Sequence, residues 1–360
     1  MSKIKVCYTL SYKSPQYVRT TSIVEALKRL PRIELYEARN RNKSFIRYLE
    51  TLVKFCVIRI KANPKYCVIG FRGHEIYWLI RLLSIKKILI FDAMMSPYDS
   101  FVNERRQLKE QSLLAKFIHY YEKSILHNTN IILTDTIKHK QFFREMFCVD
   151  ENKIHVIPIS TDEKTFSKKN LKHKRSNDRF TVLFYATFLP LHGVDVVLEA
   201  ARKLKDLPIH FIIIGGKGKK KALQQFHEFV NNEDLTKIEH QEWVEFSELP
   251  SYIDKADLCL GGPFGTTQQA KRVVTGKTMQ FLYMGKPTVI GEIDEENNFV
   301  HGENIMLVEQ GNAKQLANVI KQAYLGEYNL DDIGNKGEKL YHMKFSNEQI
   351  SKIIDKIIIE

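Results

Sequence analysis

Short runs of β-branched and aromatic residues alternate with longer amphipathic runs along this chain of 360 residues. The run at residues 3–10 is followed by a helix-length pattern at 17–30, and the same sequence of signals recurs up to residue 157. It starts again at 180–185 with a helical pattern at 194–204. Strands that alternate with helices form parallel sheets covered by helices on both faces. We therefore expect an α/β protein with two such sheets in succession.

The polar stretch at residues 167–179, SKKNLKHKRSNDR, separates the two series of elements. Its many cations and few apolar residues are typical of a linker between domains. Strands are expected before it at 3–10, 65–70, 86–91, 130–134 and 154–157, and helices at 17–30, 44–61, 75–84 and 101–127. Strands are expected after it at 180–185, 209–214, 239–244, 257–260, 288–290 and 305–308, and helices at 194–204, 219–230, 249–255, 277–284, 313–324 and 347–358.

Positive charge is concentrated in the first half of the chain. Residues 1–165 contain 29 Lys and Arg against 16 Asp and Glu, whereas residues 166–360 contain 26 of each. This distribution favours an anionic partner for the first half, such as a membrane surface, a phosphorylated acceptor or a nucleic acid. A compositional bias towards lysine is the alternative, although such a bias would be expected in both halves.

The five cysteines are scattered without a CxxC pair, which favours reduced thiols in a cytosolic protein and argues against a zinc site. No apolar run is long enough to cross a bilayer, because Lys or Arg interrupts each one. The first residues lead directly into a strand-like run, too short for a secretory signal.

Glycine-rich or cationic segments follow the expected strands of the second half. They are residues 186–193 (ATFLPLHG), 215–218 (GGKG), 261–267 (GGPFGTT), and Arg272 and Lys277 around the start of the helix that contains Gln280. Glycines let backbone amides approach a phosphate, and Lys and Arg add charge-assisted hydrogen bonds. Each segment alone is compatible with ordinary turn chemistry. Because ligands of parallel sheets bind beyond the carboxyl ends of the strands, the four segments together predict a diphosphate site in the cleft between the two sheets.

These segments resemble a known enzyme family. Residues 184–204 (FYATFLPLHGVDVVLEAARKL) resemble the start of the second domain in family-4 retaining glycosyltransferases of the GT-B fold. Residues 277–290 (KTMQFLYMGKPTVI) resemble the donor-site helix of that family. The resemblance implies two Rossmann-like domains that face each other across a cleft. It assigns residues 1–165, with a returning final helix at 345–360, to the acceptor, and residues 166–344 to a nucleotide-sugar donor.

The resemblance also implies site residues, with departures from the family pattern. The family's diphosphate-binding Arg and Lys fall on Thr187 and His192, and its two Glu fall on Arg272 and Gln280. A subgroup pattern, Phe-Gly-Thr…Ala-x-Arg-Val…Lys-x-x-Gln, matches residues 264–280 more closely, so Lys277 and Arg272 are expected to neutralise the diphosphate. The donor-site residues implied are Thr187, His192, Gly193, Gly215, Gly216, Phe264, Gly265, Thr266, Thr267, Arg272, Lys277 and Gln280.

In the first half, His74 and Asp92 each follow an expected strand, where a parallel sheet would deliver a side chain to the cleft. Asp92 stands near the position of a His in many family members. We expect these two as catalytic or acceptor-contacting residues. The alternative for Asp92 is that it caps a helix or turn beside Ser96 and Pro97. The alternative for His74 is a capping or packing role.

The expected function is therefore transfer of a hexosyl group from a UDP- or GDP-linked sugar to a polysaccharide or lipid-linked acceptor. Retention is implied by the resemblance. The sequence has no Asp-x-Asp motif, which favours a metal-independent, cofactor-free reaction. The alternatives are a nucleotide-sugar epimerase of the same fold, or a basic protein that binds nucleic acid, for which the sequence has no recognisable motif.

Residues 39–65 suggest a membrane surface as the anionic partner of the first half. Their core, SFIRYLETLVKFCVIRIK, mixes aromatic and aliphatic residues with Arg47, Lys54, Arg59 and Lys61. This pattern is typical of a helix at the surface of an anionic membrane. It also fits a helix packed on the first sheet, and the two roles can occupy different faces. We expect a cytoplasmic protein that binds the inner face of the membrane peripherally.

Overall fold

The computed structural model describes residues 3–15, 17–167, 179–293, 295 and 297–359. The chain forms two compact units, of which unit 1 is Met1–Ser160 with Asn347–Glu360 and unit 2 is Thr161–Ser346. The expected linker at 167–179 lies outside the described residues except for its two end residues. Each unit contains one six-stranded sheet in which the paired strands are parallel, as the alternation predicts.

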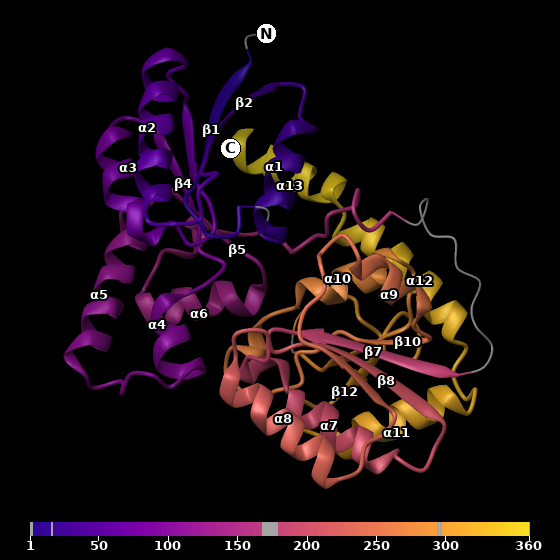
Figure 1. The fold of residues 1–360 in the computed structure, drawn as a ribbon. Helices are drawn as coiled ribbons and strands as arrows, with labels where there is room; N and C mark the ends of the chain where they lie inside the picture. Colours follow the sequence, from indigo (N-terminus) through magenta and orange to yellow (C-terminus); the bar gives the residue numbers. More distant parts are fainter. Residues whose placement is uncertain (1–2, 16, 168–178, 294, 296, 360) are drawn as a thin grey trace. The chain divides into compact units, whose positions relative to one another are not determined.

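Unit 1 has the strand order β2-β1-β3-β4-β5-β6 (Figure 1). Its strands are β1 (Ile4–Leu10), β2 (Ile33–Arg39), β3 (Tyr66–Ile69), β4 (Ile88–Asp92), β5 (Ile131–Thr134) and β6 (Ile154–Val156). Its helices are α1 (Val18–Lys28), α2 (Ile46–Lys61), α3 (Tyr77–Leu83), α4 (Pro97–Asp99), α5 (Leu113–His127), α6 (Ile137–Phe147) and α13 (Asn347–Ile359), with short turns η1 (Gly73–Ile76), η2 (Ser100–Glu104) and η3 (Glu151–Lys153).

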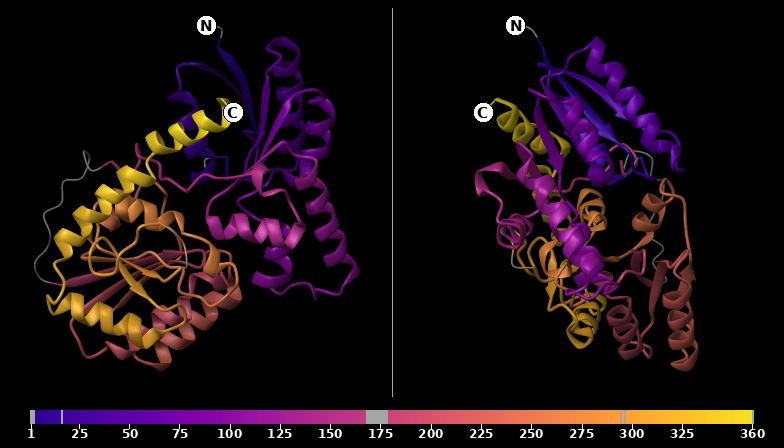
Figure 2. Two further views of the ribbon diagram at one scale, coloured as in Figure 1. Left: turned by 180° about the vertical axis from the view of Figure 1, so that it is seen from behind. Right: turned by 90° about the vertical axis from the view of Figure 1, so that its left-hand side faces the viewer.

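The two faces of this sheet are covered by different helices, because successive side chains of a strand point to opposite faces. Val6 and Tyr8 of β1 pack with α1 and α13, whereas Cys7 packs in the core beneath α2, α3, α5 and α6. Helix α13 lies beside α1, as Figures 1 and 2 show. The Ser351 hydroxyl donates to the Ala26 carbonyl at 3.0 Å, so the end of the chain is part of unit 1.

Unit 2 has the strand order β12-β11-β10-β7-β8-β9. Its strands are β7 (Phe180–Ala186), β8 (Ile209–Gly215), β9 (Ile238–Gln241), β10 (Leu258–Leu260), β11 (Thr288–Gly291) and β12 (Met306–Val308). Its helices are α7 (Val194–Lys203), α8 (Lys220–Asn232), α9 (Leu249–Lys255), α10 (Gly276–Tyr283), α11 (Ala313–Tyr324) and α12 (Leu330–Lys344), with turns η5 (Pro190–His192) and η6 (Ala270–Arg272). Helices α7, α8 and α11 share one core cluster, and α9 and α10 share another.

Both sheets contain a point at which the strand order reverses. In unit 2 the chain runs from β7 outward through β8 to β9, and then returns to place β10 on the other side of β7. In unit 1 the corresponding point lies between β1 and β3. Ligands of open parallel sheets bind beyond the carboxyl ends of the strands at such a point. The β7/β10 edge and the β1/β3 edge are therefore the places to look for sites.

Some elements differ from the sequence expectation. Strand β2 and helices α6 and α12 were not expected, and the single helix expected at 101–127 is divided into the short turn η2 and helix α5. Helix α5 begins where it does because the Ser112 hydroxyl caps it, accepting from the Ala115 amide at 3.2 Å.

Candidate functional site

The loops that follow β7 and β10 are in direct contact at the carboxyl edge of the second sheet. Gly193, which precedes α7, has a φ of +64°, and a Cβ there would lie 2.5 Å from the carbonyl carbon of Phe264 and 2.6 Å from the nitrogen of Gly265. The Gly265 amide donates to the Leu191 carbonyl at 3.1 Å. Only glycine combines this backbone conformation with so close an approach. The structure therefore brings Gly193, Phe264 and Gly265 together.

Phe264 contributes its backbone to this edge, because its side chain is fully buried in the core. Its ring lies 6.3 Å from that of Phe184, which belongs to β7. Its carbonyl accepts from the Gly311 amide at 2.8 Å. The ring therefore anchors the glycine-rich loop to the sheet and leaves the main chain at the surface of the core.

Lys277, the second residue of α10, is the most unusual charged group of unit 2. Its side chain is buried, with 7% of the residue exposed, and its Nζ has no hydrogen-bond partner among the described residues. The Nζ lies over the Phe184 ring, 4.5 Å from the ring centre. Burial lowers the pKa of Lys277 to about 7. A buried amine at the start of a helix is unfavourable in the absence of an anion, because both desolvation and the helix dipole oppose its charge.

His192 lies near this amine. Burial and the charge of Lys277 lower the pKa of His192 well below its ordinary value, so its imidazole is neutral. Its Nδ1 accepts from the Leu189 amide at 3.3 Å, which fixes the ring inside the turn before Gly193. The imidazole therefore contributes a neutral polar edge next to the cation.

The start of α10 is tied to the β10 loop by its capping residue. The Thr275 hydroxyl donates to the Gly261 carbonyl at 2.7 Å and accepts from the Thr278 amide at 3.4 Å. A Cβ on Gly262 would lie 3.7 Å from Cε of Lys277, so the lysine side chain runs along this loop. The cap and the glycines together determine where the amine lies.

Gln280 is buried one turn further along α10 and is held by a residue that the sequence did not indicate. The Tyr185 hydroxyl donates to Oε1 of Gln280. Burial raises the pKa of Tyr185 well above its ordinary value, so this hydroxyl keeps its proton. The hydrogen bond orients the Gln280 amide and leaves its NH2 group as the donor. A tyrosine in a strand gives no local signal for such a role.

The other expected donor-site residues occupy the surrounding loops. Thr187 and Thr266 are exposed, and Arg272 is half-buried in η6. The Thr267 hydroxyl accepts from the Ala270 amide at 3.2 Å and so shapes that turn. Gly215, the last residue of β8, packs against Ala186 at the end of β7, and Gly216 packs against Phe188 of the β7 loop. No described contact joins these last two glycines to Lys277, so their role in donor binding stays a prediction.

In unit 1, Asp92 is at the end of β4 and is bound to Arg19, which the sequence did not single out. Both carboxylate oxygens accept from Nε of Arg19, at 3.1 and 3.2 Å, and both side chains are fully buried. The guanidinium also donates to the carbonyls of Ile157 and Thr134. Burial raises the pKa of Asp92, although Arg19 opposes this shift. This pair joins α1 to β4, to β5 and to the residue after β6, so the contacts of Asp92 are those of a structural anchor.

His74 lies in η1, directly after β3 at the β1/β3 edge. It is buried, its Nε2 has no hydrogen-bond partner in the part of the chain that the structure describes, and its ring meets Phe91 edge-on at 4.9 Å. Burial, with a smaller contribution from Arg72, lowers the pKa of His74 to about 3. The imidazole is therefore neutral at any physiological pH. Its role in contacting an acceptor stays a prediction.

A second buried pair follows β5. Nδ1 of His139 lies 2.7 Å from Oδ1 of Asp135, and both side chains are almost fully buried. Asp135 precedes Thr136, the residue that caps α6, and His139 is in the first turn of the helix, so the pair joins the β5 loop to α6. Because α6 was not expected from the sequence, this pairing was not expected either.

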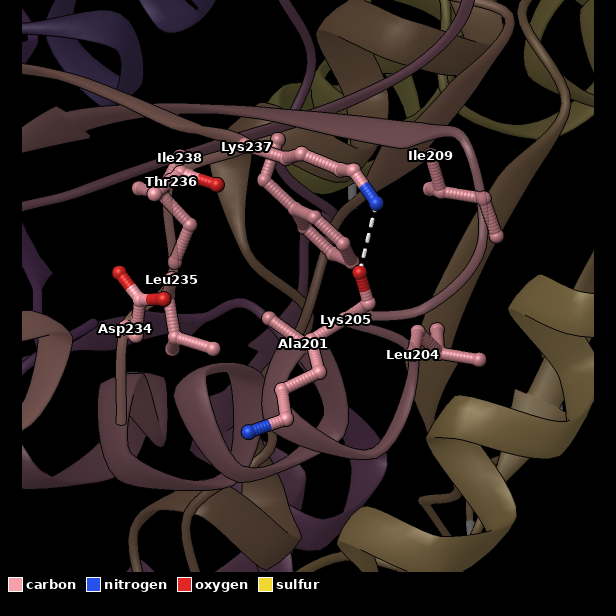
Figure 3. Close-up of a pocket in the computed structure, with 10 residues that line it drawn as sticks. Ala201, Leu204, Lys205, Ile209, Asp234, Leu235, Thr236, Lys237 and Ile238 are labelled. Atoms are coloured by element: carbon pink, nitrogen blue, oxygen red, sulfur yellow. Dashed lines mark hydrogen bonds between the residues drawn. The ribbon is translucent and has the colours of Figure 1, made fainter.

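A small pocket in unit 2 lies at the other end of the sheet (Figure 3). Ile209 and Ile238, the first residues of β8 and β9, are among its lining residues. The Nζ of Lys237 donates there to the Lys205 carbonyl at 2.6 Å, so this ammonium group already has a partner within the protein. The pocket is thus at the amino ends of the strands, away from the glycine-rich loops.

Comparison with protein families gave a match in the second half of the chain. Residues 179–325, which include the β7 and β10 loops and α10, match the family model described as glycosyl transferases group 1. This region of the chain therefore matches the group 1 glycosyltransferases. No curated protein sequence matches it.

Solved structures show that the glycosyltransferase has the GT-B fold over its whole length. Anabaena HepE in complex with UDP is 12% identical with a TM-score of 0.73, over 99% of each chain. Sucrose-phosphate synthase from Thermosynechococcus elongatus is 14% identical with a TM-score of 0.73, over 99% of this chain and 98% of its own. A glycosyltransferase from Rickettsia africae is 16% identical with a TM-score of 0.70, over 99% and 97%. At these identities the likeness concerns the fold.

Proposed function

We propose that this glycosyltransferase transfers a hexosyl group from a UDP-sugar, whose diphosphate is bound by Lys277 and by backbone amides of the β7 and β10 loops. The observation that carries the proposal is the buried Nζ of Lys277 at the β7/β10 edge, which has no partner among the described residues. A diphosphate would supply the anion that this amine lacks. Structures of HepE in complex with UDP and with UDP-glucose support UDP as the nucleotide, and GDP is the alternative.

The reaction we propose retains the configuration of the sugar and needs no metal or cofactor. The bond between the anomeric carbon and the phosphate oxygen breaks, and an acceptor hydroxyl oxygen forms its bond to the same face of that carbon. The proton of the hydroxyl passes to the departing phosphate, so the products are the glycoside and UDP. The Lys277 ammonium and the loop amides stabilise the negative charge that develops on the phosphate. The Gln280 amide donates to a ribose hydroxyl.

We further propose that the acceptor is a polysaccharide or lipid-linked glycan that contacts unit 1, and that the enzyme works in the cytoplasm. The net positive charge of residues 1–165 supports an acceptor that carries phosphate. Five free cysteines support a reducing compartment. His74 is the unit 1 side chain that we expect near the acceptor, because its buried Nε2 lacks a partner among the described residues.

The test is a screen of UDP- and GDP-sugars with the full chain, in which released nucleotide and the anomeric configuration of the released or transferred sugar are measured. Lys277→Met is expected to bind the nucleotide more weakly, whereas Lys321→Met, which changes an exposed lysine on α11, is expected to bind it like the wild type. Equal turnover in the two variants would contradict the donor site. Conversion of the UDP-sugar into its epimer would instead indicate the epimerase.

A further inference from the structure

Exposed apolar side chains are concentrated on one layer of unit 1. Fifteen of the 22 large apolar side chains that are exposed among the described residues fall between residues 45 and 120. They are Phe45, Ile46, Leu49, Val53, Val57 and Ile60 on or next to α2, Trp78, Leu79, Leu82, Leu83 and Ile85 on or after α3, and Leu113, Leu114, Phe117 and Tyr120 on α5. Single exposed apolar residues are ordinary on protein surfaces, but such a concentration marks an interaction site.

Helix α2 has two apolar faces. Thr51 and Phe55 point into the core against the sheet, while Leu49, Val53 and Val57 recur at intervals of four residues on the opposite side. A helix with one apolar stripe needs a single partner, whereas one that is apolar on opposite sides needs two. The sheet of unit 1 is the first partner. The second is not supplied by the contacts described within unit 1.

Helices α3 and α5 repeat this arrangement. Tyr77 and Ile80 of α3 are buried, and Leu79, Leu82 and Leu83 lie on the other side of the helix. On α5, Ala115, Ile125 and Leu126 are buried, while Leu114, Phe117 and Tyr120 are exposed. The buried sides of all three helices belong to one core cluster, so their exposed sides face away from the sheet together.

The three helices are held as one layer (Figures 1 and 2). Nε of Arg59 near the end of α2 donates to the carbonyl of Leu83 at the end of α3, at 3.2 Å. The Tyr77 hydroxyl of α3 lies 2.9 Å from the Thr129 hydroxyl, just beyond α5. We call the outward apolar side chains of α2, α3 and α5 the outer face.

The segments that carry the outer face are rich in cations. Residues 41–61, 77–87 and 113–127 contain eleven Lys and Arg but only two acids, Glu50 and Glu122, and Glu122 is buried. A bilayer with anionic lipids offers both components that this face needs, an apolar interior and negative headgroups, with each nearby cation contributing favourably. A second copy fits poorly, because a twofold interface would bring the same cations against one another.

We propose that the outer face docks the enzyme onto a bilayer that contains anionic phospholipids. Apolar side chains such as Leu49, Leu82 and Phe117 enter the boundary between headgroups and acyl chains, and exposed cations such as Lys43 and Lys86 contact the headgroups. Docking through unit 1 does not depend on the nucleotide site of unit 2. The docking proposal and the proposed transfer reaction can therefore be tested independently.

Flotation of the full chain with vesicles tests this proposal. We expect binding to mixed phosphatidylcholine and phosphatidylglycerol vesicles at low salt, and weak binding to phosphatidylcholine alone or at high salt. The variant with Leu49→Gln, Val53→Gln and Val57→Gln is expected to bind the anionic vesicles at least about tenfold more weakly, because it loses apolar burial. A second variant with Leu82→Gln and Phe117→Gln, on different helices, is expected to behave in the same way.

The matched control carries Trp243→Gln, Leu325→Gln and Met343→Gln, which change equally exposed apolar residues of unit 2 and should leave vesicle binding unchanged. Thermal unfolding and UDP binding of every variant show that the fold is intact. Wild-type protein that ignores anionic vesicles at low salt would overturn the proposal, as would outer-face variants that bind like the wild type. Sedimentation that shows a wild-type dimer dissociated by the outer-face changes would also overturn it, in favour of a second copy as the occupant.

Discussion

Lys277 combines two properties that have opposite consequences for stability and for binding. Its amine is buried without a hydrogen-bond partner among the described residues, which weakens the free protein. The same burial makes its interaction with a bound phosphate strong, since a charge-assisted bond gains strength where water is excluded. The sequence pattern around 264–280 pointed to this residue, but it could not show that the side chain is enclosed by the Phe184 ring and the β10 loop.

Lys277→Met should therefore raise stability while it lowers affinity. We expect the free energy of unfolding at pH 7 to rise by about 1–3 kcal/mol, because a buried polar group is replaced by an apolar one of similar length. We expect UDP affinity to fall by roughly 10–100-fold, the usual effect of losing a hydrogen bond to a charged group. Denaturant unfolding and calorimetric titration measure the two effects. A variant that loses both stability and affinity would show that the lysine is structural.

The lowered pKa of Lys277 also predicts a pH dependence. In the unfolded chain the lysine has its ordinary pKa near 10.5, and in the folded enzyme burial lowers the pKa to about 7. Between these values the unfolded state binds more protons, so the contribution of Lys277 to stability rises with pH from about 7 to about 10.5. A bound diphosphate favours the charged amine, so UDP binding above pH 7 should take up a proton and weaken as the pH rises. Titration calorimetry in buffers of different ionisation enthalpy measures that proton, and Lys277→Arg should abolish its uptake.

At the scale of elements, the contact between the β7 and β10 loops depends on backbone rather than side chains. Gly193 begins α7 with a positive φ and almost touches the main chain of Phe264 and Gly265. In the sequence, such a contact is visible only as a glycine. The strand-to-loop pattern therefore indicated the region of the site but not its geometry. The Tyr185–Gln280 hydrogen bond is a similar case, because a strand and a helix distant in sequence supply its two partners.

Gly193→Ala is expected to separate the two loops. The Cβ would strain the positive φ and clash with the Phe264 carbonyl carbon, so we expect a loss of about 1–3 kcal/mol in stability. UDP affinity should fall as well, because Gly265 would move away from the β7 loop. Gly326→Ala is the matched control, since Gly326 also has a positive φ but a Cβ there would meet no atom of the described residues within 4 Å. Equal UDP affinity in the two variants would contradict the assigned role of the loop contact.

Two of the elements that were not predicted from the sequence show why the prediction missed them. Helix α12 contains Gly334 and Gly337, which read as loop residues, but each lets the helix approach a backbone carbonyl, of Gly285 and of Asn304. Strand β2 is only partly buried and pairs on one side alone, so it has no continuous apolar run. The buried central strands have such runs, and they were the elements that the alternation located best.

At the scale of the whole molecule, unit 1 is completed by a helix from the other end of the chain. Ile350 of α13 is fully buried against the core formed with α1, and Tyr66 of β3 donates to the carbonyl of Ile358 at 2.8 Å. The sequence predicted the two sheets because strand alternation is a local signal. The order of strands within each sheet, and so the position of the β7/β10 edge, is set by packing across the sheet and could not be predicted in the same way.

Ile350→Ala should destabilise unit 1 alone. Removing a fully buried isoleucine side chain is expected to cost about 2–5 kcal/mol, whereas Ile359→Ala on the same helix, where the residue is 61% exposed, should cost little. Scanning calorimetry with and without UDP separates the units, because the nucleotide raises the unfolding temperature only of the unit that binds it. A shift of the UDP-sensitive transition in Ile350→Ala would show that α13 stabilises unit 2 instead.

The return of α13 has a consequence for biosynthesis. Residues 161–346 leave the ribosome before 347–359, so unit 2 has its complete sequence while unit 1, although begun first, still lacks one helix. Until that helix emerges, the side of α1 that carries Ile23, Val24 and Leu27 stays uncovered in the nascent polypeptide. Unit 1, most of which is translated before unit 2, is thus the last of the two to reach its native state, and a nascent chain stalled before residue 347 would expose a hydrophobic surface for chaperones to bind.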